Sequence, residues 1–172
     1  MKNIKKYKKL QLLGTLVILA VISGEVQAIS RCRVSLNRFD FGLYYPMQSG
    51  HLDVTGTMRV RCQGGPGNYS IGIDAGSSGS ITRRAMQENR GGGGGRGQGN
   101  MRVRGVLEYN FFIDAARSIV WGDITGPNVI MGRHTQRSSP RGEIINFHGR
   151  VFSNQDPEPG RYRDRLTVTI QF

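Results

Sequence analysis

Few residues of this 172-residue chain have the types and spacing that cofactor binding or catalysis requires. A glycine-rich stretch contains a formal G-x-G-x-x-G at Gly92, Gly94 and Gly97. That motif binds a dinucleotide only when a strand precedes it and a helix follows it, because the pyrophosphate sits on the helix N-terminus. Neither element is predicted around these glycines, so we attribute the match to chance within a glycine tract.

The other polar candidates favour structural roles. The histidines share no spacing typical of a metal site, and they are His51, His134 and His148. Asp114 and Asp123 flank Trp121 and could form a carboxylate pair, but turn caps beside a buried tryptophan explain them better. No G-x-S-x-G motif is present. We therefore predict no enzyme activity, no catalytic residue, no cofactor and no bound metal.

The first 28 residues predict a secretory signal peptide. Five lysines lie within Met1–Leu10, an uncharged 15-residue stretch covers Leu10–Gly24, and Val26-Gln27-Ala28 provides a cleavage site after Ala28. The alternative is a membrane anchor, but about 20 apolar residues are needed to span a bilayer. We therefore predict export of residues 29–172.

Residues 29–172 are predicted to form one domain, long enough to bury a substantial core. Removing the signal takes away five lysines and Glu25, so the net charge falls from +12 to +8. All 19 basic residues that remain are arginine. This composition excludes a Schiff-base lysine or a Walker lysine from the exported domain.

Cys32 and Cys62 are the only cysteines of the chain. They are 30 residues apart, which excludes a C-x-x-C redox or zinc motif. In an exported protein an even number of cysteines indicates a disulfide, and two cysteines leave one possible pairing. Such a bond contributes roughly 3–4 kcal/mol in the chain-entropy model. Two free buried thiols are the alternative.

Apolar and polar residues alternate along much of the domain, which is typical of half-buried strands. The pattern is found in Val54–Cys62, Tyr69–Ile73 and Ile145–Val151. It is clearest at the end of the chain, with apolar positions at Leu166, Val168, Ile170 and Phe172. Further apolar runs cover Phe39–Tyr45, Val106–Ile113 and Ser118–Trp121. Turn-forming residues separate these segments and no 3.6-residue period is sustained, so we predict an all-β sandwich or barrel.

Gln87–Gly105 differs from the rest because it contains five consecutive glycines surrounded by arginines. Such a run is predicted to be a flexible loop joining two strands. Its arginines resemble an RGG nucleic-acid tract, but no aromatic residue is interleaved for base stacking and the domain is predicted to be exported. We therefore expect no nucleic-acid partner, and a contact of these arginines with an anionic surface or polysaccharide remains open.

The stretch from Leu107 to Asp123 resembles the signature L-x-Y-x-L/F-Y/F-x-D-A-A-R-x-x-V-W-G-D of the spore coat protein U domain family. That family includes the pilins of archaic, Csu-type chaperone–usher fibres. Other parts of the chain agree with it in order: Cys32, Phe41-Gly42, Cys62, Ile71–Gly79, Arg84-x-Met86, Gly149–Val151, Pro159–Asp164 and the final alternating strand. Phe112 replaces the commoner tyrosine, and the Gln87–Gly105 loop is longer and richer in arginine than usual.

The resemblance implies an incomplete immunoglobulin-like β-sandwich that lacks its last strand and is completed by a donor strand from another chain. A periplasmic chaperone would lend that strand until a neighbouring pilin subunit replaces it at an outer-membrane usher. Leu166, Val168, Ile170 and Phe172 would contact the chaperone or the donor strand. The implied function is a structural or adhesive subunit of a cell-surface fimbria, in cell attachment and biofilm formation.

This sequence departs from the polymerising pattern at its N-terminal side. Cleavage after Ala28 leaves Ile29-Ser30-Arg31 before the first cysteine, whereas a donor strand needs about ten alternating residues. We therefore expect a subunit that accepts a strand without donating one, either at a fibre tip or outside a fibre. The alternative function is a free-standing secreted spore or cell coat protein whose sandwich is complete by itself.

Overall fold

The computed structural model describes residues 29–46, 49–89, 105–135 and 140–172. The predicted signal peptide and most of the glycine-rich loop lie outside these ranges. The described elements are β1 (Ile29–Leu36), β2 (Leu52–Gly64), β3 (Gly67–Ile73), the 3₁₀ turn η1 (Gly76–Ser78), β4 (Arg84–Glu88), β5 (Val106–Phe112), β6 (Ile130–His134), β7 (Glu143–Val151), β8 (Tyr162–Arg163) and β9 (Val168–Gln171).

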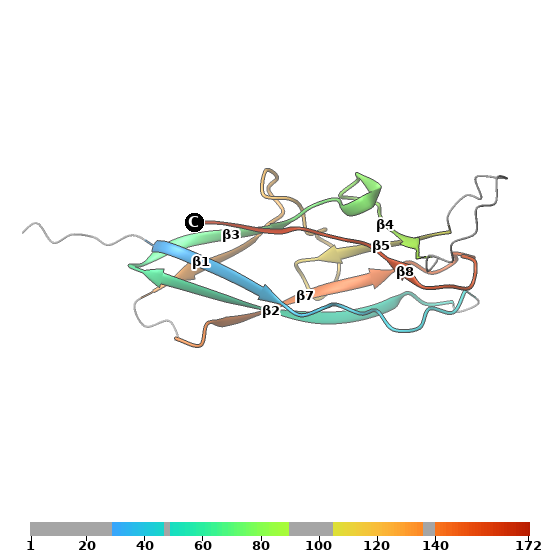
Figure 1. Ribbon diagram of the computed structural model, residues 1–172, viewed down its shortest axis with the longest axis horizontal. Helices are drawn as coiled ribbons and strands as arrows, with labels where there is room; N and C mark the ends of the chain where they lie inside the picture. Colours follow the sequence, from blue (N-terminus) through green and yellow to red (C-terminus); the bar gives the residue numbers. More distant parts are fainter. Residues whose placement is uncertain (1–28, 47–48, 90–104, 136–139) are drawn as a thin grey trace, which may run out of the picture.

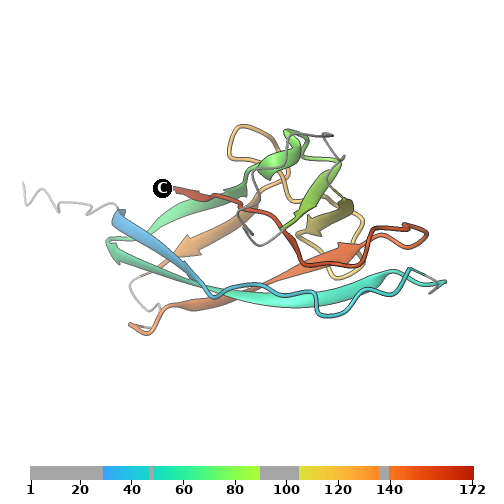
Figure 2. The same ribbon diagram turned by 45° about the vertical axis from the view of Figure 1, so that its right-hand side comes forward.

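The strands form two sheets. The larger sheet has the order β1-β2-β7-β5-β4-β8, and the smaller has the order β6-β3-β9. All pairings are antiparallel. Figures 1 and 2 show β2 and β7 in one layer, with β3 and the C-terminal segment in the other. The all-β prediction is therefore confirmed, as a two-sheet sandwich.

The period-two pattern decides which side chains fill the space between the sheets. Along β2, Met58 and Val60 are buried, while Thr57, Arg59 and Arg61 at the alternate positions are exposed. Tyr69 and Ile71 of β3 are buried in the same way. These faces meet in one core that also contains Trp121, Phe111, Phe147 and Val151. The alternation predicted from the sequence thus identifies the core faces correctly.

The disulfide joins Cys32 of β1 to Cys62 of β2, and the described residues contain no free cysteine. The two residues lie directly opposite each other in the β1–β2 register, with Cα atoms 4.0 Å apart. The predicted pairing is confirmed. The alternating pattern predicted a strand over Val54–Cys62, and β2 extends two residues further at each end, from Leu52 to Gly64.

Several predicted segments have different boundaries or roles in the structure. Phe39–Tyr45 forms no strand. Its aromatic rings cover the edge of the core instead, and the ring centroids of Phe39 and Phe111 lie 5.1 Å apart. Gln87 and Glu88 belong to β4 and not to the glycine-rich loop. That segment does join two strands, β4 and β5, which pair with each other. None of the helices in the described ranges is long and apolar enough to cross a membrane.

Candidate functional site

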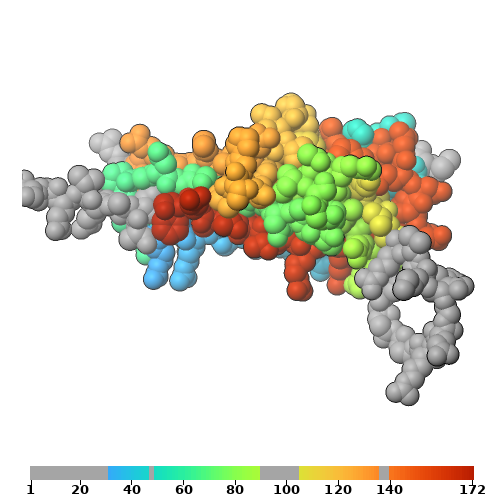
Figure 3. Space-filling view, turned by 90° about the horizontal axis from the view of Figure 1, so that it is seen from above, coloured from blue at the N-terminus to red at the C-terminus, as the bar shows by residue number. Residues whose placement is uncertain are grey.

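One edge strand of each sheet lies along the same side of the sandwich. β1 is an edge strand of the larger sheet and β9 is an edge strand of the smaller one. Cα atoms of the two strands come within 8 Å of each other. In Figure 3 the C-terminal segment (red) reaches the surface between β3 (green) and β1 (blue). We call the boundary between β1 and residues 166–172 the β1–β9 seam.

Each strand at the seam has one side without a backbone partner among the described residues. There β1 pairs with β2 alone, and β9 pairs with β3 alone. Unpaired N–H and C=O groups on an edge strand can accept a further strand. The seam is therefore a candidate site for strand addition.

The seam contains the side chains that the sequence analysis assigned to a donor-strand contact. Leu166, Val168 and Ile170 are half-buried and pack against the core. Phe172 is 53% exposed, and Leu36 at the end of β1 is 39% exposed. The apolar surface along the seam is therefore only partly covered within the chain.

Hydrogen bonds fix the segment that leads into β9. The Asp164 carboxylate accepts bonds from the Tyr109 hydroxyl (2.7 Å) and from the Ser77 hydroxyl (2.6 Å). Burial, and then the bond to Asp164, raise the pKa of Tyr109, so the phenol stays protonated and donates. The backbone N–H of Asp74 donates to the Thr167 carbonyl at 3.1 Å. Together these bonds hold the chain against the core just before β9 begins.

A buried arginine ties the middle of the sandwich together. The side chain of Arg84 is fully buried, and burial lowers its pKa. It donates to the carbonyls of Asp74 (2.8 Å), Ile73 (3.0 Å) and Trp121 (2.8 Å) and to Oδ1 of Asn110 (2.6 Å). The guanidinium thus joins the end of β3 to β5 and to the segment that follows β5.

The two aspartates beside Trp121 cap turns, as the sequence analysis favoured. Asp114 accepts bonds from the backbone N–H groups of Ile119 and Ser118, which lower the pKa of its carboxyl group to about 2. The Asp123 carboxylate accepts from the hydroxyl and N–H of Thr125, which lowers its pKa as well. Trp121 is buried and donates from its indole N–H to the Ile71 carbonyl at 2.8 Å.

The histidines lie apart from one another on strands and loops. Nδ1 of His148 lies 3.0 Å from the Thr55 hydroxyl, and Nδ1 of His51 accepts from the Ser153 N–H at 2.9 Å. His134 ends β6. No group of three metal-binding side chains was found in the described part of the chain.

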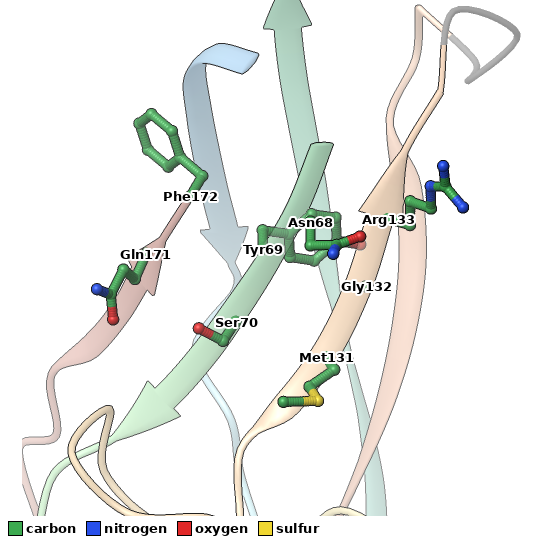
Figure 4. Close-up of a pocket in the computed structure, with 8 residues that line it drawn as sticks. All are labelled: Asn68, Tyr69, Ser70, Met131, Gly132, Arg133, Gln171 and Phe172. Atoms are coloured by element: carbon green, nitrogen blue, oxygen red, sulfur yellow. The ribbon is translucent and has the colours of Figure 1, made fainter. Parts of the chain in front are cut away.

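A shallow hollow opens on the smaller sheet next to the end of β9 (Figure 4). Its lining comes from β3, β6 and the C-terminal residues, and consists of Asn68, Tyr69, Ser70, Met131, Gly132, Arg133, Gln171 and Phe172. None of these eight lining residues is a histidine, cysteine, aspartate or glutamate. The glycines of the formal dinucleotide motif, Gly92, Gly94 and Gly97, lie outside the described residues.

No structural role for Arg84 or Asn110 is predicted from the sequence. The alternation around Arg84 could have revealed its burial, because Arg84 and Met86 lie on the same face of one strand. In the structure they pair with Tyr109 and Leu107, which are both buried. A single arginine at an inward position is easily taken for a boundary residue when the strand order is unknown.

Comparison with known families and structures supports this architecture. The family model described as the Spore Coat Protein U domain matches residues 18–169, a range that begins within the predicted signal peptide. No curated protein matches the chain.

Two of the solved structures that are similar to the chain contain pilus subunits. One contains the CsuC–CsuE chaperone–tip adhesion subunit pre-assembly complex from archaic chaperone–usher Csu pili of Acinetobacter baumannii. The match has 19% identity and a TM-score of 0.51, and covers 83% of this chain but only 40% of that chain. The other is HdaB, the minor tip subunit of the E. coli Hda pilus, with 15% identity, a TM-score of 0.39 and coverage of 80% and 79%. The first match supports the incomplete immunoglobulin-like fold.

Proposed function

Because this chain belongs to the Spore Coat Protein U domain family, we propose that it is a subunit of a chaperone–usher surface fibre that accepts a donor strand at the β1–β9 seam. The observation that carries the proposal is the edge of β9 that has no backbone partner in the described part of the chain and is lined by partly covered apolar side chains. A donor strand would pair with this edge and cover Val168, Ile170 and Phe172 at the same time.

The energetics favour such an addition. Full burial of one large aliphatic or aromatic side chain contributes roughly 1.5–3 kcal/mol. Phe172 is 53% exposed and Leu36 is 39% exposed, so a substantial part of that free energy is still available at the seam. An exposed edge with apolar side chains also promotes aggregation. A periplasmic chaperone would prevent aggregation until a neighbouring subunit takes its place at an outer-membrane usher.

The seam must widen before a strand can enter it. Hydrogen-bonded neighbouring strands lie about 4.8 Å apart, so a strand between β9 and β1 requires a separation of roughly twice that distance. The two strands come within 8 Å of each other in this structure. Strand addition would therefore displace β1, together with the disulfide-linked β2, from the C-terminal segment.

The chain would reach the periplasm through the predicted signal peptide and the cell surface as part of the fibre, where adhesion and biofilm formation are the expected roles. Ile29 and Arg31 already pair with β2 within β1. They are thus engaged in the subunit's own sheet, in keeping with a subunit that accepts a strand.

Adjacent positions of β9 provide the test. Val168 is half-buried and packs against the core, whereas Thr169 is exposed on the opposite face. The chain and its variants are co-expressed with a tagged periplasmic chaperone of the chaperone–usher class, and the captured subunit is quantified. Val168→Asp is expected to lose capture, because the donor strand would have to cover a charge. Thr169→Asp is expected to retain it.

A second measurement tests strand addition without relying on the Val168 variant being folded. A donor strand is fused behind a flexible linker after Phe172, and hydrogen exchange is followed at the β9 amides that face away from β3. Protection of these amides, with a gain in solubility, is expected. Two results would contradict strand addition at this edge: unchanged hydrogen exchange of these amides in the fusion, or chaperone capture that Val168→Asp does not reduce.

The alternative function, a free-standing coat protein, is favoured by the close approach of β1 and β9, which already narrows the seam. The two proposals predict different behaviour of the exported chain expressed alone. A coat protein would purify as a monomer that unfolds cooperatively. A fibre subunit would aggregate or be degraded unless a chaperone or donor strand is supplied.

A further inference from the structure

The outer face of β1 and β2 carries a block of exposed arginines. Arg31 and Arg33 lie on β1, and Arg59 and Arg61 lie on β2, all with their side chains away from the core. The antiparallel register places Arg33 directly opposite Arg61. We call these four residues the arginine block.

Among the residues that the structure describes, no carboxylate neutralises the arginine block. None of the ion pairs found among the described residues involves any of its four members. Asp53, on the same face at the other end of β2, is bound by Arg150 and Arg117. The carboxylate of Glu143, which is opposite Val60, accepts a bond from the Tyr69 hydroxyl at 2.7 Å.

The block has an unfavourable arrangement for a sheet surface. Like charges directly opposite each other on neighbouring strands destabilise the pair. Nε of Arg61 donates to the backbone carbonyl of Arg141 at 2.9 Å, which is a neutral acceptor and does not cancel the charge. The Arg33–Arg61 pair therefore costs stability unless an anion lies close to both guanidinium groups. A bound anion turns the same arrangement into a pair of charged donors, of the kind that binds a carboxylate.

The surroundings of the block indicate the class of the anion. Same-face side chains repeat about every 6.7 Å along a strand, so the block is a ladder of charges and suits a polymer with repeated acidic groups. Uncharged polar residues continue the same face, with Ser35 opposite Arg59 and Thr57 opposite Asn146. Ile144, opposite Arg59, is 61% exposed. Hydroxyl groups and the apolar faces of sugar rings match these neighbours.

We propose that the outer face of β1 and β2 binds a linear, carboxylated polysaccharide through the arginine block. A lipid surface fits less well, because Ile144 is the one large apolar side chain found exposed on this face among residues 31–36, 52–64 and 143–151, whose side chains the structure describes. Single-stranded nucleic acid lacks an aromatic platform among the neighbours just named. The arginines of the 87–105 segment are also candidates for such a contact from the sequence, but Arg90, Arg96, Arg102 and Arg104 lie outside the described residues.

The proposal goes beyond the role as a fibre subunit and uses a different surface from strand addition. The seam involves the unpaired backbone edges and inward apolar side chains, whereas the arginine block lies on the outward face of the larger sheet. If the chain does not bind polysaccharide, capture by the chaperone can still occur. If the chaperone does not capture the chain, polysaccharide binding can still occur, so the two proposals fail independently.

The test uses two charge-matched triple variants of the exported chain. The first is Arg31→Gln, Arg33→Gln and Arg59→Gln. The control is Arg161→Gln, Arg163→Gln and Arg165→Gln, which removes the same charge from exposed residues in and around β8. Binding to immobilised polygalacturonate is measured over a salt series, with neutral dextran as the blank.

The first variant is expected to bind on the order of a hundredfold more weakly, if each arginine contributes as it does near other anionic surfaces, and to show a shallower salt dependence. The control is expected to stay within about threefold of the parent, because screening weakens the effect of distant charges. Equal losses in both variants, or no loss in the first, would overturn the proposal. So would tighter binding to single-stranded DNA or to anionic phospholipid vesicles than to polygalacturonate.

A single substitution separates binding from folding. Arg33→Gln removes the repulsion opposite Arg61, so it is expected to leave the melting temperature unchanged or raise it while weakening polygalacturonate binding by about fivefold. A lower melting temperature together with unchanged affinity would show that Arg33 has a structural role instead.

Discussion

Replacing Arg84 by methionine should destabilise the sandwich far more than the same change at its neighbour Arg83. Arg84 is fully buried and donates four hydrogen bonds, three to backbone carbonyls and one to Asn110. Methionine fills much of the volume but leaves these acceptors without their charged donor. Arg83 has a side chain that is 73% exposed and makes one ion pair, with Glu108.

The magnitude follows from the bonds that are lost. Hydrogen bonds to a charged group contribute about 1.5–3 kcal/mol each, so four bonds represent roughly 6–12 kcal/mol. Removing a buried charge also removes its desolvation cost, which offsets several kcal/mol. We therefore expect Arg84→Met to lower the free energy of unfolding by about 3–5 kcal/mol. Arg83→Met should cost about 0–1 kcal/mol, as is usual for an exposed ion pair.

Urea denaturation of the oxidised, exported chain measures both values, and a thermal scan should show a fall of roughly 10 °C or more for Arg84→Met. Arg84→Lys gives an intermediate case, because an ammonium group keeps the charge but has three donors for four acceptors. If Arg84→Met were as stable as Arg83→Met, the buried guanidinium would not be holding β3, β5 and Trp121 together.

Three further predictions concern the disulfide and two aspartates. Mass spectrometry of the unreduced protein should show one linked peptide containing Cys32 and Cys62 and a deficit of two hydrogens, whereas two alkylatable thiols would contradict the pairing. Asp114 has a folded-state pKa of about 2, below its ordinary value of 3.8, so its stabilising effect is present above pH 4 and is lost as the pH falls through 2. Asp114→Ala should therefore unfold at lower urea concentration than the parent at pH 7, with the difference shrinking towards pH 2; a constant difference would argue against its ionised turn cap. Asp164→Ala removes the acceptor of the Tyr109 and Ser77 hydroxyls, so it should lower the free energy of unfolding by about 1–3 kcal/mol and speed hydrogen exchange in β9. Unchanged exchange in β9 would mean that other contacts hold the strand.

Some features of the candidate site could be predicted from the sequence and others could not. The apolar positions at Leu166, Val168 and Ile170 follow from the period-two pattern, because alternate side chains of a strand face the same side. Phe172 follows the same pattern but is 53% exposed, because burial depends on whether another strand lies above it. The pattern of one strand contains no information about that neighbour. The strand that would pair with the second edge of β9 is therefore a proposal, which the chaperone-capture assay tests.

The sequence by itself determined the fold class, the core faces and the disulfide. Alternation sets which side of each strand is apolar, and two cysteines allow a single pairing. Only the tertiary structure decided which strands are neighbours, and with them the two surfaces that matter most here. Arg84 becomes a buried crosslink because β3, β5 and the Trp121 segment converge on it. Arg33 and Arg61, 28 residues apart in the chain, become a like-charged pair because the β1–β2 register places them opposite each other. Such contacts depend on chain topology, and local propensity cannot determine topology because the same alternating strands can pair in many orders.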